Sequence, residues 1–215
     1  MTRIALIHAL AHSVAPINTA LARDWPEAVR MNLLDDSLSA DLAASGRGLD
    51  AAMHARFARL AQYAVDCGSQ GILFTCSAFG PCIEAVARQH APLPVLKPNE
   101  AMVADAVALG GPIGLIASFA PTLQSMPPEF PAGTQLYTAL VAEALAALNA
   151  GDGARHDALV AEAGEQLRQQ GAQVIALAQF SMARARDRVA ARTGLPVLTT
   201  VDSAVRALRG RLAKI

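Results

Sequence analysis

The stretch "GSQGILFTCSAFGPCIEAVARQHAPLPVL", residues 68–96, recurs later in the chain as "GAQVIALAQFSMARARDRVAARTGLPVL", residues 171–198. Both copies open on glycine, run through an apolar strand and a helix containing Val-Ala, and close on Leu-Pro-Val-Leu. The beginning of the chain repeats as well, because "RIALIHALAHSV" at 3–14 matches "PIGLIASFAPTL" at 112–123. Self-similarity on this scale predicts two related halves.

Short apolar runs rich in β-branched residues alternate with longer Ala-rich amphipathic runs, which is typical of parallel sheets with helices on both faces. We expect an α/β fold of two pseudo-symmetric, flavodoxin-like halves with an active-site cleft between them. The first half would span residues 1–100, with the C-terminal helix as a candidate to pack there, and the second would span 101–215. Strands are expected at 3–9, 28–34, 71–76, 93–96, 112–118, 134–139, 173–179 and 195–200. Helices are expected at 50–68, 80–90, 99–110, 137–151, 156–171 and 182–194.

The composition argues against polyanionic partners. The chain of 215 residues is 53% hydrophobic and carries 18 Lys and Arg against 18 Asp and Glu, so no net field attracts nucleic acid or an anionic membrane. No segment approaches the roughly 20 apolar residues of a membrane span. We therefore expect a small neutral or anionic ligand, no nucleic acid and no membrane, while the Ala-rich helices leave room for a homo-oligomer.

The three cysteines are too few for a secreted disulfide framework, which favours a cytoplasmic location. Zinc-ligand spacings are missing, so no metal is expected. Neither a phosphate loop nor a Rossmann glycine fingerprint is present, so no nucleotide cofactor is expected either. The apolar N-terminus "MTRIALIHALAHSVAP" is interrupted by two histidines, and we interpret it as a first strand rather than a signal peptide.

Ligands of parallel α/β sheets bind at the carboxyl ends of the strands. Cys76 and Gln179 each follow a predicted strand and occupy equivalent positions of the repeat. Cys76 lies where a strand meets a helix predicted to begin at Ser77. Helix N-terminal amides would favour the thiolate and make Cys76 a candidate catalytic residue. Free cysteine is also among the most buried residue types, and we expect Cys67 and Cys82 to serve packing.

Other polar or aromatic residues share these strand ends and are candidates for contacts with a carboxylate. The predicted substrate-binding residues are Ser13, Thr75, Ser77, Ser118, Thr122, Gln179, Phe180 and Ser181. The hydroxyl residues among them are equally typical of helix N-caps. His12 and His8 are possible bases for Cys76, although a structural histidine remains the alternative for each.

Together, "LFTCSAFG", "ALAQFSMA" and the duplicated halves resemble the aspartate/glutamate racemase superfamily, which includes hydantoin racemases, maleate isomerases and arylmalonate decarboxylases. The resemblance implies two facing cysteines, one in each half, that remove and return a proton on opposite faces of the substrate's α-carbon. Cys76 matches the first of them, whereas Gln179 stands at the position of the second. An amide neither accepts nor releases a proton at a usable pKa, so two-thiol racemisation lacks one reagent.

A single cysteine suffices where the carbanion arises by other means, as the resemblance to arylmalonate decarboxylases implies, although their cysteine lies in the second half. We therefore expect a cofactor-independent isomerase, racemase-like enzyme or decarboxylase that acts on a small carboxylate or carbonyl compound through Cys76. Two alternatives stay open. One is a hydrolase or transferase with Cys76 as covalent nucleophile, and the other is a non-catalytic module that binds small carboxylates.

Overall fold

The computed structural model describes residues 2–213, and the chain forms two compact units. Unit 1 consists of the chain up to Pro98 together with the segment from Ala204 onward, and unit 2 is Asn99–Ser203. Helix α10 (Thr200–Leu212) begins in unit 2 and continues into unit 1. Within residues 2–213, every helix is too short or too polar to span a membrane.

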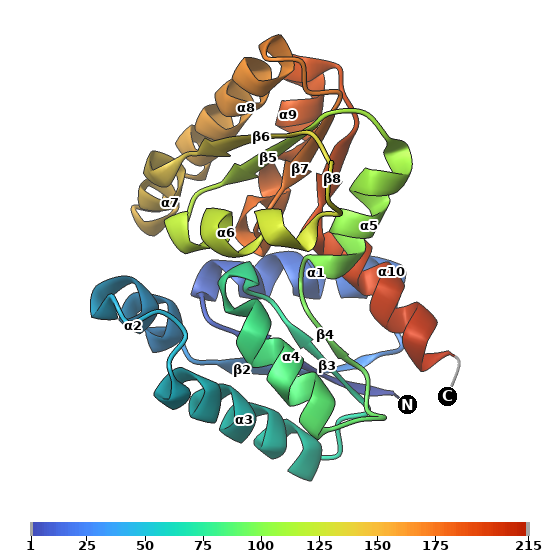
Figure 1. The fold of residues 1–215 in the computed structure, drawn as a ribbon. Coiled ribbons are helices and arrows are strands. Elements are labelled where there is room, and N and C mark those ends of the chain that lie inside the picture. The colour runs from blue at the N-terminus through green and yellow to red at the C-terminus, as the bar shows by residue number, and fades with distance from the viewer. Residues whose placement is uncertain (1, 214–215) are drawn as a thin grey trace. The chain divides into compact units, whose positions relative to one another are not determined.

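Unit 1 contains a four-stranded parallel sheet in the order β2-β1-β3-β4 (Figure 1). Its strands are β1 (Arg3–His8), β2 (Val29–Leu34), β3 (Gly71–Phe74) and β4 (Val95–Leu96). Its helices, besides α10, are α1 (Val14–Asp24), α2 (Ser37–Ser45), α3 (Ala51–Asp66) and α4 (Gly80–Gln89). The central strands β1 and β3 are almost entirely apolar and buried, as a sheet covered on both faces requires.

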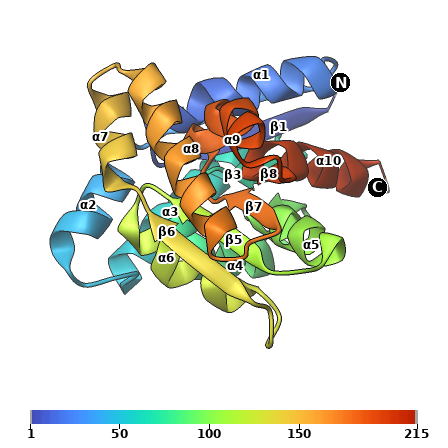
Figure 2. The same ribbon diagram turned by 90° about the horizontal axis from the view of Figure 1, so that it is seen from above.

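Helices cover both faces of this sheet. On one face, Phe57 of α3 stacks on Phe74 of β3 with ring centroids 5.2 Å apart, and it also meets Phe79 at 4.9 Å. Figures 1 and 2 show α1 and α10 on the other face. There α10 packs directly over Gly71, where a Cβ atom would lie 3.1 Å from Leu212 Cδ1. The missing side chain of Gly71 lets the last helix approach β3.

Unit 2 repeats the same sheet, in the order β6-β5-β7-β8. Its strands are β5 (Ile113–Ala117), β6 (Leu136–Leu140), β7 (Val174–Leu177) and β8 (Val197–Thr199). Its helices, besides the start of α10, are α5 (Glu100–Leu109), α6 (Ala120–Ser125), α7 (Ala142–Asn149), α8 (Gly153–Gln169) and α9 (Arg186–Thr193). Alternate residues of β5 enter different cores: Leu115 packs with α5, whereas Ile116 packs with α8 and α9.

The duplication predicted from the sequence is confirmed by the identical strand orders of the two units. Cys76 follows β3 and Gln179 follows β7 at the same distance, and both have extended backbones, with φ/ψ of −127°/118° and −135°/145°. One predicted helix, 137–151, is wrong at its start. Tyr137 pairs with Gly114 in β6, and helix α7 begins only at Ala142. Ala and Leu are compatible with both structures, and pairing with β5 decides in favour of the strand.

Candidate active site

Cys76 lies at the carboxyl edge of the unit 1 sheet, where β3 gives way to a 3₁₀ turn. The turn occupies Ser77–Phe79 and α4 begins at Gly80, so the helix predicted to begin at Ser77 starts three residues later. Cys76 is half-buried. It closes a narrow crevice that has no room for a water molecule. The other residues that line this crevice are Ile7, His8, Ala9, Leu38, Phe57 and Phe74.

The pKa of the Cys76 thiol is raised above its ordinary value, because burial removes water from the charged form. Hydrogen bonds from the Ala78 backbone N–H and from Ser39 act in the opposite direction without reversing the shift. The expectation that helix amides favour the thiolate is therefore wrong in its net direction. At neutral pH Cys76 is a thiol, which has a proton to donate.

His8 is completely buried at the end of β1, and both of its ring nitrogens are hydrogen-bonded. Nε2 lies 3.0 Å from Asn32 Oδ1, an oxygen that also accepts a hydrogen bond from Asn18 Nδ2 at 2.8 Å. Since that oxygen only accepts, Nε2 carries the proton. Burial lowers the pKa of His8, so the ring is neutral and Nδ1 accepts from Thr75 Oγ1 at 2.8 Å.

Through these two hydrogen bonds His8 holds Asn32 and Thr75 in place. Neither nitrogen is available to take a proton from Cys76, so the possible role of His8 as a base is not supported by its geometry. Its bond to Thr75 instead fixes the residue that precedes the cysteine. Thr75 is 2% exposed, and its hydroxyl proton is directed to His8 Nδ1, with the Ile7 carbonyl as a second, longer acceptor at 3.4 Å, so only its oxygen lone pairs are left for other contacts.

The neutral state of His8 predicts a pH dependence of stability. Its folded pKa lies below the ordinary value of 6.5, so folding favours the neutral ring, and stability is lost as pH falls from 6.5 toward the folded value. One such proton contributes a slope of up to about 1.4 kcal/mol per pH unit. In His8→Gln this contribution disappears. The difference in unfolding free energy between wild type and variant, measured in urea, should shrink between pH 7.5 and pH 5, whereas a constant difference would contradict a neutral His8.

The other two cysteines lie elsewhere in unit 1. Cys82 is 1% exposed in the first turn of α4, and burial, reinforced by the charge of Asp50, raises its pKa to about 11. Cys67 is half-buried and follows the last residue of α3, where its backbone carbonyl accepts a hydrogen bond from Arg3. The burial of Cys82 agrees with the packing role that we expect, and the packing role of Cys67 stays a prediction.

Gln179 occupies the corresponding edge of unit 2 and is held by Ser118. Its Oε1 accepts a hydrogen bond from the Ser118 backbone N–H at 2.6 Å and another from Ser118 Oγ at 3.2 Å. The backbone N–H can only donate, so the amide oxygen must face Ser118, and the orientation of the side chain is fixed. The NH₂ group of Gln179 is thereby turned away from Ser118 with two protons to offer.

The remaining predicted residues are divided between the two edges. In unit 1, His12 and Ser13 lie in the 3₁₀ turn that follows β1, and Ser77 lies in the turn that follows Cys76. In unit 2, Thr122 is on α6, and Phe180 and Ser181 follow Gln179. Ser181 is 2% exposed, and among residues 2–213 its Oγ finds no hydrogen-bond partner. Its hydroxyl proton is therefore available to a ligand or to water.

Two residues near Cys76 were missed by the sequence reasoning. Asn32 Oδ1 accepts hydrogen bonds from both His8 and Asn18. Ser39 Oγ lies 4.0 Å from Cys76 Sγ. A polar residue in the otherwise apolar end of β2 was a signal for Asn32. The Asp-Asp-Ser run at 35–37, typical of a helix N-terminus, was a signal for α2, which carries Ser39.

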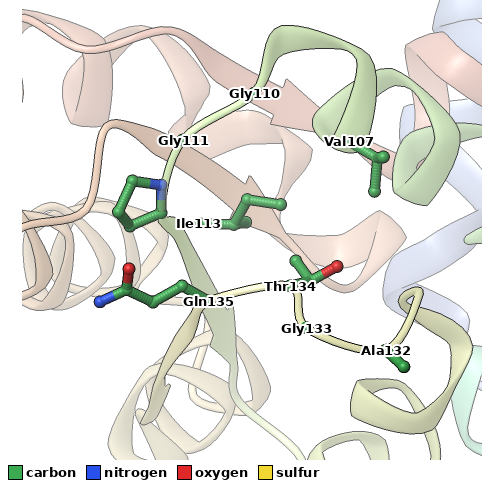
Figure 3. Close-up of a pocket in the computed structure, with 9 residues that line it drawn as sticks. Val107, Gly110, Gly111, Ile113, Ala132, Gly133, Thr134 and Gln135 are labelled. Carbon is green, nitrogen blue, oxygen red and sulfur yellow. The ribbon is translucent and has the colours of Figure 1, made fainter.

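A larger cavity, of about 440 Å³, lies at the opposite edge of the unit 2 sheet (Figure 3). It is bordered by the loops before β5 and β6, including Gly111 and Thr134, and no charged side chain is among its lining residues. None of the predicted site residues belongs to it. Within residues 2–213 no three His, Cys, Asp or Glu side chains are grouped to hold a metal ion.

The duplicated parallel sheets, with polar residues at the carboxyl ends of β3 and β7, define a class of two-unit α/β proteins. A sequence model described as Asp/Glu/Hydantoin racemase matches residues 11–208. The chain belongs to this family, and that membership supports a racemase or isomerase function. No curated protein matches the sequence.

Solved structures with the same fold include three racemases, each with low sequence identity to this chain. A glutamate racemase isoform from Bacillus anthracis has a TM-score of 0.79 and 12% identity, covering 99% of this chain and 82% of its own. An allantoin racemase from Klebsiella pneumoniae gives 0.74 and 16%, covering 100% and 89%. An aspartate racemase from Picrophilus torridus gives 0.74 and 11%, covering 100% and 94%. At these identities the likeness establishes the fold.

Proposed function

We propose that the protein is a cofactor-independent isomerase, racemase-like enzyme or decarboxylase that uses a single thiol, Cys76, at the α-carbon of a small carboxylate or carbonyl compound. The observation that carries the proposal is the pairing of Cys76 with Gln179 at equivalent positions of the duplicated fold. The substrate class follows from the family and from related structures that are named as racemases of glutamate, aspartate and allantoin.

Cys76 acts as a proton donor in this proposal. Its pKa is raised by burial, so the thiol form carries the proton at neutral pH. A carbanion or enediolate forms on the substrate either when its C–C bond to carbon dioxide breaks or when a base, His12 or water, removes the α-proton. It then takes the proton from the Cys76 sulfur, a C–H bond forms as the S–H bond breaks, and the resulting thiolate regains a proton from water. Positioned proton transfer of this kind contributes about 10²- to 10⁴-fold to a rate.

Gln179 and Ser181 supply hydrogen-bond donors for the substrate's oxygens. The amide oxygen of Gln179 is occupied by Ser118, so the side chain presents its NH₂ group, and the Ser181 hydroxyl is buried with no partner among the described residues. Donors that are already oriented stabilise developing negative charge without reorganising. The proposal predicts that substitutions at Gln179 alter the KM of the reaction that depends on Cys76.

The nucleophilic alternative is less well supported by the geometry. A covalent nucleophile needs the thiolate and an adjacent base, but the pKa of Cys76 is raised and His8 has both nitrogens engaged. His12, in the turn after β1, is the remaining candidate base. A thioester adduct on Cys76, trapped and located by mass spectrometry, would establish this alternative.

The proposal is tested with a panel of amino acids, hydantoins and substituted malonates incubated with the protein in deuterated water. We expect at least one compound to incorporate deuterium at its α-carbon, with or without loss of carbon dioxide, as seen by proton NMR and mass spectrometry. Absence of exchange, isomerisation and decarboxylation across the panel, alongside saturable binding of the same compounds, would contradict the enzyme and favour a binding module.

A further inference from the structure

The first turn of helix α2 lies directly beside Cys76. Ser39 Oγ is 4.0 Å from Cys76 Sγ, at the outer limit of a hydrogen bond to sulfur. The preceding residue, Leu38, is completely buried and lines the same crevice as Cys76. Leu38 and Ser39, two successive residues of α2, therefore both lie beside the Cys76 thiol. No motif in the sequence connects this helix with the cysteine.

Arg56 of α3 fixes this turn from the other side. Its guanidinium donates to Asp35 Oδ2 at 2.7 Å, to Ser37 Oγ at 2.5 Å and to Asp41 Oδ2 at 2.6 Å. Ser37 Oγ in turn donates to Asp35 Oδ1 at 2.6 Å. Although partial burial opposes it, these hydrogen bonds and the charge of Arg56 hold the pKa of Asp35 below its ordinary value, so the group stays ionised at neutral pH. We call these four residues the Arg56 clamp.

Beyond its first turn, α2 contributes Leu42 to the buried core and borders an open pocket. A pocket of about 420 Å³ separates its C-terminal part from α3, with Ala44 and Ser45 on one side and Met53 on the other. An open space of that size provides no packing contact. The position of Ser39 therefore depends mainly on Leu38 beside it and on the Arg56 clamp around it.

We propose that Ser39 is a positioning residue for Cys76, donating a hydrogen bond to its sulfur when the thiol has given up its proton, and that the Arg56 clamp holds Ser39 in place for this task. The catalytic use of the contact rests on the function proposed above. The contact itself is a property of unit 1 and can be measured without a substrate.

The charges around the sulfur suit this role. When the proton leaves Cys76, the sulfur becomes an anion, and Ser39 O–H and the Ala78 N–H both favour that anion. His8 is the titratable side chain that shares the crevice with Cys76, and it is neutral. The charges of Arg56, Asp35 and Asp41 are paired within the clamp. The Ser39 hydroxyl is therefore a side-chain donor near the sulfur that a substitution can remove.

The test measures the rate at which iodoacetamide alkylates Cys76 from pH 6 to 10.5, with each cysteine resolved by mass spectrometry. The midpoint of this pH profile is the pH at which the rate reaches half of its maximum. In Ser39→Ala the midpoint of the Cys76 profile should rise by about 0.5 to 1 pH unit, the size expected for one lost hydrogen bond. Ser39→Thr keeps the hydroxyl and should restore the wild-type midpoint. Ser45→Ala, on the same helix beside the open pocket, should leave it unchanged. An unchanged midpoint in Ser39→Ala would overturn the proposal.

A second variant tests the role of the clamp. Arg56→Gln removes the charge that holds the first turn and should raise the Cys76 midpoint in the same direction as Ser39→Ala. If Arg56 acts through Ser39, the double variant should show no more than the larger single effect. Fully additive effects would contradict this link.

Turnover, followed separately with the panel of compounds, distinguishes the two proposals. A shifted midpoint in Ser39→Ala without any turnover in wild type would uphold the positioning role of Ser39 and overturn the enzyme function. Turnover that depends on Cys76, with an unshifted midpoint in Ser39→Ala, would do the reverse.

Discussion

Cys76→Ser should abolish deuterium incorporation into the substrate's α-carbon, lowering kcat by about 10²- to 10⁴-fold with little change in KM. The hydroxyl of serine is a far weaker acid than a thiol, so it cannot deliver the proton, while its similar size preserves the crevice with Leu38 and Phe74. The measurement is the initial rate of α-carbon exchange in deuterated water, followed by mass spectrometry on the compound that wild type turns over.

Cys67→Ser is the matched control for this experiment. Cys67 is also half-buried in unit 1, but it lies after the last residue of α3 rather than at the carboxyl edge of the sheet. Its replacement should leave kcat within about twofold of wild type, as expected for a substitution away from the proposed chemistry. Equal losses in both variants would indicate general destabilisation, and retained exchange in Cys76→Ser would remove the cysteine from the mechanism.

Gln179→Cys should introduce or strongly raise the interconversion of enantiomers, which the single-thiol proposal does not expect of the wild-type protein. The substitution places a second thiol at the repeat position equivalent to Cys76, on the same extended backbone after β7. It also removes the amide that donates to the substrate, so KM should rise by about 10- to 100-fold, since a hydrogen bond to a charged group contributes about 1.5–3 kcal/mol. Chiral chromatography of the product measures the new activity.

Gln179→Ala separates these two effects. It loses the NH₂ donor without adding a thiol, so it should show the raised KM and no interconversion of enantiomers. Appearance of racemisation in Gln179→Ala, or its absence in a folded Gln179→Cys that still exchanges through Cys76, would contradict the view that Gln179 occupies the place of a second acid. Circular dichroism of both variants establishes that they are folded.

The duplication and the position of Cys76 could be predicted from the sequence because both depend on local pattern. Buried parallel strands are continuous apolar runs, and the residue after such a run lies at the carboxyl edge of the sheet. The same pattern places Cys76 and Gln179 at equivalent positions of the repeat. Helix α2 was not predicted, because its short segment has a weak apolar face and is held by contacts with distant α3.

The electrostatics of the candidate site could not be predicted in the same way. Helix amides near Cys76 indicated a favoured thiolate, but the pKa shift has the opposite direction because burial by the surrounding crevice outweighs them. His8 was a candidate base until its two nitrogens were found to bond Asn32 and Thr75, which lie 24 and 67 positions away in the chain. Burial and long-range hydrogen bonds depend on the packing of distant segments, which one sequence does not reveal.

The most direct test of single-thiol chemistry is the stereochemical course of the wild-type reaction. Each pure enantiomer of the active compound, or the prochiral malonate where carbon dioxide is lost, is incubated with the protein in deuterated water, and the product is resolved by chiral chromatography and mass spectrometry. Delivery of deuterium by Cys76 to one face of the carbon predicts labelled product of a single configuration. Labelling of both configurations at comparable rates in the wild-type protein would contradict the account.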